Sequence, residues 1–239
     1  MKTIIHKAGD RGYANHGWLQ ANHSFSFANY FDKEKLEFGA LRVLNDDIIA
    51  PKMGFGTHPH DNMEIITIPL NGVLKHKDNM GDEWIPVVPD EVQIMSAGTG
   101  VQHSEINGSN SEYLNLFQIW IMPNKQNVSP RYDQKTFNAN ERKNKLQTLV
   151  SSIDENHVGS LKIHQDAIIS RIDLDKEGTF EYHLKSENHC VYVMNIFGAY
   201  FINDNKLESR DAIGISETTS FKIKTNEDSG LLIIEVPIN

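Results

Sequence analysis

Short segments rich in apolar and β-branched residues follow one another along most of this chain, and Gly, Asn, Asp or Pro interrupts nearly every one. Residues 63–72 read MEIITIPLNG, and residues 113–123 read YLNLFQIWIMP. The Asn-Asp-Asp at 45–47 indicates a turn after a strand, and Asn71-Gly72 indicates a hairpin. No stretch shows the sustained period of a long amphipathic helix. Many short strands at close spacing predict an all-β protein built from sandwiches or barrels.

The order of these segments predicts two domains. The chain has 239 residues, 39% of them hydrophobic, which suffices for one large β domain or two small ones. Residues 124–145 are polar and lack a strand pattern, and strand-like segments resume at Leu161. We interpret the polar segment as a linker, with a short helix near residues 140–150. The prediction is a first domain over residues 1–134 and a second over 135–239.

Composition excludes several classes of function. The net charge is -9 and no run of Lys and Arg stands out, so direct contact with nucleic acid is not expected. Cys190 is the only cysteine, so no disulfide can form within the chain. No apolar run approaches the roughly 20 residues of a membrane span, and the N-terminal residues lack a signal-peptide core. We therefore expect a cytoplasmic protein that makes no contact with a membrane.

Two short histidine motifs carry the chemistry. Residues 54–65 read GFGTHPHDNMEI, and residues 98–107 read GTGVQHSEIN. Side chains two residues apart on a strand point to the same face. His58 and His60 can therefore aim at one point, and so can His103 and Glu105. Three imidazoles and one carboxylate are a common ligand set for Fe, Mn, Ni, Co or Zn, and the lack of a thiolate disfavours a structural zinc site.

Either motif alone is weak evidence for a metal. Scattered histidines usually lie at the surface or form ordinary hydrogen bonds, and this chain has 11 of them. The second pair also stands beside a Gly-rich turn in strand-rich sequence. The two pairs together favour a metal centre with one or two positions open for water or substrate.

The sequence around the two motifs identifies a family more specifically than the motifs themselves. The segments HGWLQANHSFSFANYFD, FGALRVLNDD, HKDNMGD and QIWIMP, together with the two motifs, resemble the pirin family of the cupin superfamily, in particular its bacterial quercetinase-like branch. The resemblance is dense over residues 10–135 and looser beyond them. One departure is Gly98, which stands where the second cupin motif usually has a proline.

The resemblance implies a bicupin, in which one chain forms two jelly-roll-like β-barrels and only the N-terminal barrel holds a metal. The family's ligands fall on His58, His60, His103 and Glu105. The implied cofactor is one divalent transition metal, with iron first and Mn, Ni, Co, Zn or Cu as alternatives. Most cupins have a ligand glutamate at the spacing of Glu64, so Glu64 stays the less favoured candidate, as a ligand or beside the metal.

The same resemblance implies flavonol 2,4-dioxygenation, commonly called quercetinase activity. A 3-hydroxyflavonol such as quercetin loses its hydroxyl proton, O2 adds across the heterocycle, and the ring opens with release of CO. Glu105 is expected to be both a ligand and the base that takes this proton. Phe55, Met95 and Phe117 stand beside the motifs, where they either line a flat aromatic pocket or pack in the core.

Two other functions stay open. Some pirins act as metal- or redox-dependent regulators that bind a partner protein without turnover, and the acidic composition fits this hypothesis equally well. A different cupin reaction, such as isomerisation of a polar substrate, would need charged groups in the cavity. The sequence offers few candidates for such groups, so this hypothesis ranks last.

The remaining histidines and aromatic residues are assigned to structure. The C-terminal half has no H-x-H, and its dispersed histidines predict no second metal site: His157, His164, His183 and His189. Cys190 is expected to be a small buried residue. His16 and His23 lack the spacing of ligands. Core positions are expected for the other aromatic residues near the motifs, namely Trp18, Phe25, Phe27, Tyr30, Phe31 and Trp120.

Overall fold

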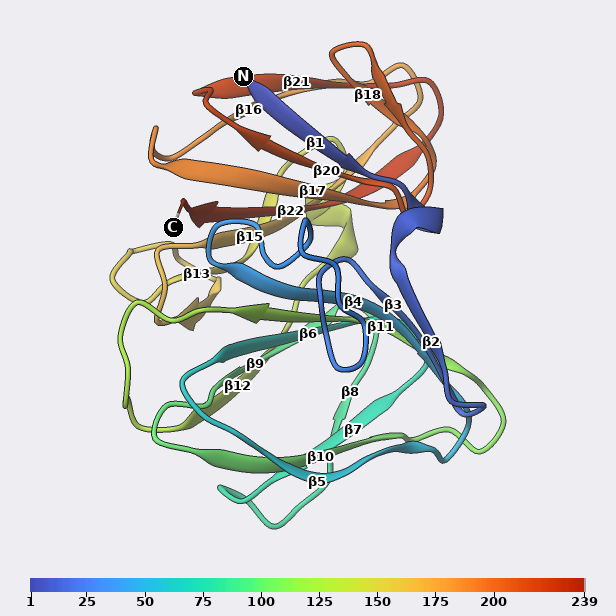
Figure 1. Cartoon of the computed structure of the whole chain (residues 1–239), viewed down its shortest axis with the longest axis vertical. Helices are drawn as coiled ribbons and strands as arrows, with labels where there is room; N and C mark the ends of the chain where they lie inside the picture. The colour runs from blue at the N-terminus through green and yellow to red at the C-terminus, as the bar shows by residue number, and fades with distance from the viewer. Residues whose placement is uncertain (239) are drawn as a thin grey trace.

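Strands dominate the computed structural model, which describes residues 1–238 (Figure 1). They form four sheets, two of seven strands and two of four. Each half of the chain builds one large and one small sheet, and the two face each other. The all-β prediction is therefore confirmed. None of the described residues belongs to a helix long and apolar enough to span a membrane.

The N-terminal unit lies in the lower part of Figure 1. Its large sheet contains, in spatial order, β12 (Arg131–Thr136), β9 (Glu91–Ser96), β6 (Glu64–Asn71), β11 (Leu114–Ile121), β4 (Leu41–Ile49), β3 (Leu19–His23) and β2 (Gly12–Asn15). Its small sheet contains β5 (Gly54–His60), β10 (Val101–Asn107), β7 (Leu74–Asp78) and β8 (Ile85–Val87). Leu116 of the large sheet and Leu74 of the small sheet belong to one buried apolar cluster, so the two sheets close on a shared interior.

The C-terminal unit repeats this architecture. Its large sheet contains β1 (Lys2–His6), β20 (Ala212–Ser216), β17 (His189–Phe197), β22 (Ser229–Pro237), β15 (Ile168–Leu174), β13 (Gln147–Ser152) and β14 (Leu161–Ile163). Its small sheet contains β16 (Thr179–His183), β21 (Ser220–Thr225), β18 (Tyr200–Ile202) and β19 (Asn205–Leu207). All strand pairs of this unit are antiparallel except β13 with β14.

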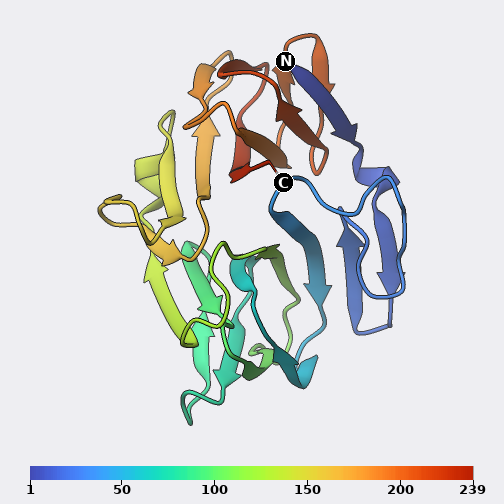
Figure 2. The ribbon, with the colours of Figure 1, turned by 60° about the vertical axis from the view of Figure 1, so that its left-hand side comes forward.

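The first strand of the chain crosses from one unit to the other. β1 pairs with β20 at the edge of the C-terminal sheet, and a short 3-10 helix, Ala8–Asp10, leads from it to β2 (Figures 1 and 2). The sequence prediction placed residues 1–134 in the N-terminal domain, so residues 2–6 depart from it. The backbone groups at the edge of β20 form hydrogen bonds with β1. The sequence near β1 does not indicate this pairing, because β20 lies about 200 residues away.

The two large sheets pack on each other through one continuous apolar core. Leu44 and Ile66 of the N-terminal sheet and Tyr192 and Leu232 of the C-terminal sheet are all buried in it. The interior of the C-terminal unit is a separate cluster. The two units therefore share a core and also close their own interiors.

The polar segment at 124–145 differs from the predicted linker. Residues 131–136 form β12, which pairs with β9 along its whole length. The helix expected near residues 140–150 is a single 3-10 turn, Ala139–Arg142, and β13 begins soon after it. Partly exposed edge strands need few apolar residues, so their polar composition reads like a linker. The boundary predicted between residues 134 and 135 falls inside β12.

Two predicted turns also differ. Asn45, Asp46 and Asp47 are buried inside β4, which continues to Ile49. Gly72, which has a φ of 84°, turns the chain from the large sheet to the small one, so β6 and β7 do not form a hairpin. The apolar residues on either side of each predicted turn are compatible with a turn and with a continuous or differently paired strand. The choice between these structures depends on partner strands that are distant in sequence.

Candidate metal centre

The two histidine motifs lie on neighbouring strands of the small N-terminal sheet. β5 and β10 pair antiparallel, and His58 stands directly opposite His103. Because side chains alternate along a strand, His58, His60 and His103 all point to one side of the sheet. The ligand nitrogen atoms of these three residues lie within 4.8 Å of one another. The Nε2 atoms of His60 and His103 are 3.0 Å apart.

A glycine and a bulge let the two strands approach. The register of β10 against β5 shifts between His103 and Glu105, and beyond the shift Ile106 stands opposite Gly54. A Cβ atom at Gly54 would lie 2.1 Å from the backbone oxygen of Glu105. Any side chain at this position would push β5 away from β10. Gly54 therefore helps to bring the histidines together.

The surroundings of His60 and His103 disfavour protonation of their rings. Burial, followed by the neighbouring histidines, lowers the pKa of His103 to about 2. Burial and His58 lower the pKa of His60 to about 4. Nδ1 of His58 donates to the backbone oxygen of Gly56 at 2.8 Å, which leaves Nε2 with the lone pair. Neutral nitrogen atoms that crowd together in this way fit a divalent transition metal as their common partner.

Glu105 lies beside this cluster, on the same strand as His103. It is buried, and its Oε2 accepts a hydrogen bond of 3.1 Å from Nε2 of Gln118. Oε1 is buried without a partner. Burial raises the pKa of Glu105 to about 7. The structure thus gathers three of the four predicted ligands into one group and places the fourth close by, so the role of Glu105 as a ligand stays a prediction.

A cavity of about 440 Å³ opens beside the cluster, and we call it the inner cavity. Its lining combines aromatic rings, polar groups and two of the histidines: Trp18, Phe27, Asn45, Asp47, Gly54, Phe55, Gly56, His58, His60, Glu105, Gln118 and Trp120. A volume of this size and an aromatic wall suit a flat organic molecule. The site is therefore a candidate metal centre at the wall of a cavity with four Trp and Phe rings.

Comparison with known proteins places the chain in a family. Residues 6–121 match the family model described as Pirin, and residues 149–236 match the model described as quercetinase C-terminal cupin domain. The Escherichia coli (strain K12) protein named quercetin 2,3-dioxygenase is 44% identical over 234 residues, which are 98% of each chain. The chain belongs to the pirin family.

Other relatives support this assignment over the whole length. The pirin-like protein of Caulobacter vibrioides is 39% identical over 94% of this pirin and 95% of its own chain. The crystal structure of the bacterial pirin YhhW from Escherichia coli in complex with nickel(II) matches with a TM-score of 0.93 and 40% identity, over 100% of both chains. The predicted bicupin fold is therefore confirmed.

Glu64 lies on the other side of the large sheet. Thr67 of β6 faces Gln118 inside the N-terminal unit. Because side chains alternate along a strand, Glu64 points to the opposite face, as does Ile66 of the core between the units. Its Oε2 accepts a hydrogen bond of 2.7 Å from Ser96. The structure thus separates Glu64 from the histidines.

Several aromatic residues near the motifs differ from their predicted roles. Trp18, Phe27 and Trp120 were expected in the core, and all three line the inner cavity, while Trp18 and Trp120 also pack against buried core clusters. Phe31 was also expected in the core, yet it is 76% exposed. Phe55 lines the cavity, which is one of its two predicted roles.

Other aromatic and apolar residues lie in the core. Phe25 is buried in the core between the units, and Met95 and Phe117 are fully buried, which is the other role predicted for them. The face of a strand that lines the cavity is determined by how the two sheets pack on each other. The identity of a single residue therefore does not predict whether its side chain lies in the core or in the cavity.

Sequence reasoning missed four polar residues of the site. Asn45, Asp47 and Gln118 line the inner cavity, and burial raises the pKa of Asp47 to about 8. His76 is buried on β7 with its ring 5.2 Å from that of His103. The available signal was three consecutive polar residues inside the apolar segment at 38–49. We interpreted them as a turn, although buried polar residues inside a strand often mark a site.

Among the histidines of the C-terminal half, His189 lies between two carboxylates. Nδ1 of the buried His189 lies 2.9 Å from Oε1 of Glu235, and its Nε2 lies 3.3 Å from Asp166. Cys190 is buried and free, as predicted. The prediction of a metal-free C-terminal unit stays a prediction.

Proposed function

We propose that this pirin is a metal-dependent flavonol dioxygenase of the quercetinase type. Its substrates are a flavonol such as quercetin and O2, and its products are an opened ester and CO. One observation carries the proposal: a single cavity is bordered by gathered imidazoles, a buried carboxylate oxygen without a partner, and aromatic rings. The Escherichia coli relative named quercetin 2,3-dioxygenase supports the same activity.

In this proposal His58, His60, His103 and Glu105 hold one divalent transition ion. When bound, such an ion supplies a Lewis acid for the substrate oxygen atoms and a centre for chemistry with dioxygen. Iron is the ion that we expect. The nickel(II) complex of a relative supports a site of this kind that accepts other divalent ions as well.

Glu105 prepares the substrate by taking a proton. The hydrogen bond from Gln118 fixes one carboxylate oxygen and leaves Oε1 for the 3-hydroxyl group of the flavonol. Burial raises the pKa of Glu105 to about 7 in the metal-free protein, and a bound divalent ion would lower it, so the carboxyl is ionised and able to accept a proton at neutral pH. The flavonol then reacts as its anion.

The aromatic residues orient the reactants and exclude water. The ring of Trp120 meets the ring of His60 edge to face, with centroids 4.9 Å apart, and restricts the rotation of that ligand. Trp18, Phe27 and Phe55 offer flat apolar surfaces to a fused ring system. The aromatic part of the lining limits the contact of a bound flavonol anion with solvent.

The overall reaction balances without a further reductant. The flavonol loses its third carbon as CO, both atoms of O2 remain in the ester, and the proton held by Glu105 returns to the product. The chain therefore has to supply only binding, orientation and one proton acceptor.

An aerobic assay with quercetin and metal-reconstituted protein tests the proposal. Oxygen uptake and CO release should occur in equal amounts, and protein stripped by a chelator should produce neither. Fully metallated protein that consumes no oxygen with quercetin or any other flavonol would contradict the proposal. The hypothesis of a metal-dependent regulator would then replace it, and capture of a protein partner should depend on the metal.

A further inference from the structure

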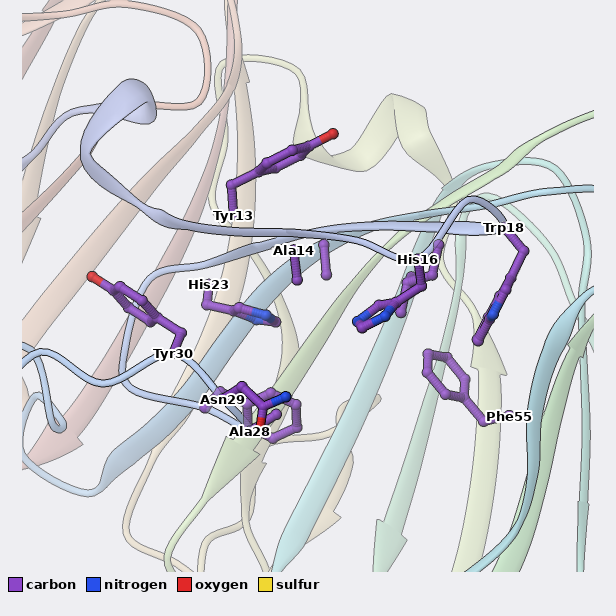
Figure 3. A pocket seen from close by; sticks show the side chains of 12 residues that line it. Tyr13, Ala14, His16, Trp18, His23, Ala28, Asn29, Tyr30 and Phe55 are labelled. Atoms are coloured by element: carbon purple, nitrogen blue, oxygen red, sulfur yellow. The ribbon is translucent and has the colours of Figure 1, made fainter.

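A second cavity, of about 510 Å³, adjoins the inner cavity, and we call it the outer cavity (Figure 3). Strands β2 and β3 and the loop after β3 supply most of its lining. Trp18, Phe27 and Phe55 line both cavities, so these three rings form an aromatic wall that the two adjoining spaces share. A space of this size can hold a substituted aryl ring.

The lining of the outer cavity favours an uncharged ring that carries polar substituents. Its 12 lining residues, all in the described part of the chain, include no Asp, Glu, Lys or Arg. A charged group would lose its hydration there without meeting an opposite charge. Figure 3 shows the rings of His16 and His23 pointing toward one another across the space, with Asn29 and Tyr30 nearby. Hydroxyl groups on a bound ring would find partners among these side chains.

His23 presents a hydrogen-bond acceptor to this cavity. Its Nδ1 lies 2.9 Å from Oδ1 of Asn45, and because an amide oxygen only accepts, Nδ1–H is the donor. Burial lowers the pKa of His23, so the ring stays neutral and Nε2 keeps its lone pair. A phenolic hydroxyl is a matching donor. Asn45 itself lines the inner cavity, so this hydrogen bond links the two spaces.

The rings of the shared wall meet each other or a neighbouring ring edge to face. Phe27 and Trp120 have centroids 5.2 Å apart at an angle of 84°, and Trp18 and Phe55 have centroids 5.3 Å apart at 71°. Perpendicular rings leave flat faces exposed in more than one direction. An aromatic ligand can therefore contact ring faces on both sides of the wall.

We propose that the outer cavity is an aryl-binding compartment for the hydroxylated 2-phenyl ring of a flavonol whose heterocycle lies in the inner cavity. The inference rests on the proposed function. A single bond joins these two parts of a flavonol, so the phenyl ring can twist as it passes the wall. The compartment makes the site specific for flavonols over smaller 3-hydroxy heterocycles.

Calorimetric measurement of ligand binding to the metal-loaded protein, in the absence of oxygen, tests the compartment without turnover. Quercetin is compared with 3-hydroxychromone, which has the same 3-hydroxyl and carbonyl oxygens but no 2-phenyl ring. Ala14 lines the outer cavity alone, so Ala14→Phe fills it, and Ala14→Leu is a smaller intrusion. Gln20→Phe is the matched control, because Gln20 lies on the exposed face of β3.

Wild-type protein should bind quercetin at least about tenfold more tightly than 3-hydroxychromone, since burying an aryl ring strengthens binding by about 10- to 100-fold. Ala14→Phe should remove most of this advantage and leave 3-hydroxychromone binding unchanged. Gln20→Phe should change neither. Equal affinity of the wild type for both ligands would overturn the compartment without any variant. Unchanged quercetin binding in folded Ala14→Phe and Ala14→Leu would also overturn it.

Oxygen uptake by the same samples in air separates this inference from the proposed function. Selective binding without any oxygen uptake would keep the compartment and remove the dioxygenase. Uptake by all variants with equal quercetin affinities would keep the dioxygenase and remove the compartment.

Discussion

Glu105 is held differently from the three histidines, and this difference gives it a separate role. A hydrogen bond from Gln118 fixes one of its oxygens, while the other has no partner. Glu105→Gln keeps most of the side-chain volume but cannot take a proton. We expect its turnover of quercetin to fall by about 10²–10⁴-fold at equal metal content. Oxygen uptake and metal analysis on the same sample measure both quantities.

The control for this variant is its metal content, because loss of the ion would also stop turnover. A fully metallated Glu105→Gln protein with normal turnover would show that another group is the base. The position of Glu64 across the sheet removes it as the substitute. Asp47, which lines the same cavity, would then be the next residue to replace.

Glu64 should affect stability rather than catalysis. Burial raises its pKa from 4.5 to about 7, so the folded state binds a proton more tightly than the unfolded state. The resulting stabilisation is complete below pH 4.5 and is lost as the pH rises through about 7. Glu64→Gln should therefore be more stable than the wild type at pH 8, relative to pH 5, by on the order of 3 kcal/mol. Urea unfolding of the two proteins at both pH values measures this difference.

The same variant should keep its full metal content and its turnover of quercetin. Loss of the metal in folded Glu64→Gln would place this carboxylate back at the ion and contradict the observed geometry. A stability difference that does not depend on pH would show that Glu64 is not protonated at low pH in the folded state.

At the scale of elements, the pairing of β5 with β10 decides whether the histidines meet. Gly54→Ala forces a Cβ against the backbone of β10, so it should weaken metal binding by about 10- to 100-fold although it changes no ligand. Gly56→Ala is the matched control, since a Cβ there meets nothing within 4 Å. Competition titration with a chelator measures both affinities. Equal affinities would mean that the close approach of the strands does not determine the site.

The sequence could predict which side chains share a face of one strand. The i, i+2 spacing paired His58 with His60 and His103 with Glu105, and the similar contexts of the two pairs predicted that they share one site. The partner of each strand was harder to predict, because pairing joins segments tens of residues apart. The polar strand β12 was therefore taken for a linker. Trp120 was assigned to the core because β11 carries apolar residues on both of its faces. The sequence therefore does not distinguish the face toward the core from the face toward the cavity.

At the scale of the whole molecule, the core between the two large sheets should make the units unfold together. All three tryptophans lie in the N-terminal half, at positions 18, 84 and 120, so their fluorescence reports on that half alone. Leu232 is a fully buried residue of the shared core and belongs to the C-terminal unit. Leu232→Ala should lower the free energy of unfolding reported by tryptophan by about 2–5 kcal/mol.

Far-ultraviolet circular dichroism reports on both halves and provides the check. Its urea transition should coincide with the fluorescence transition in the wild type and in Leu232→Ala. Two separate transitions, or an unchanged tryptophan transition in the variant, would show that the units are energetically independent despite their contact.

The central claim is that one ion held by the histidine cluster of the N-terminal unit carries the turnover of flavonols. Reconstitution of metal-free protein with increasing Fe(II), with bound metal and quercetin-dependent oxygen uptake recorded on the same samples, tests it most directly. Uptake should rise in proportion to bound metal and saturate at one ion per chain, and His58→Ala and His103→Ala should lose both. Full metal content in these variants, or oxygen uptake by metal-free protein, would contradict the claim.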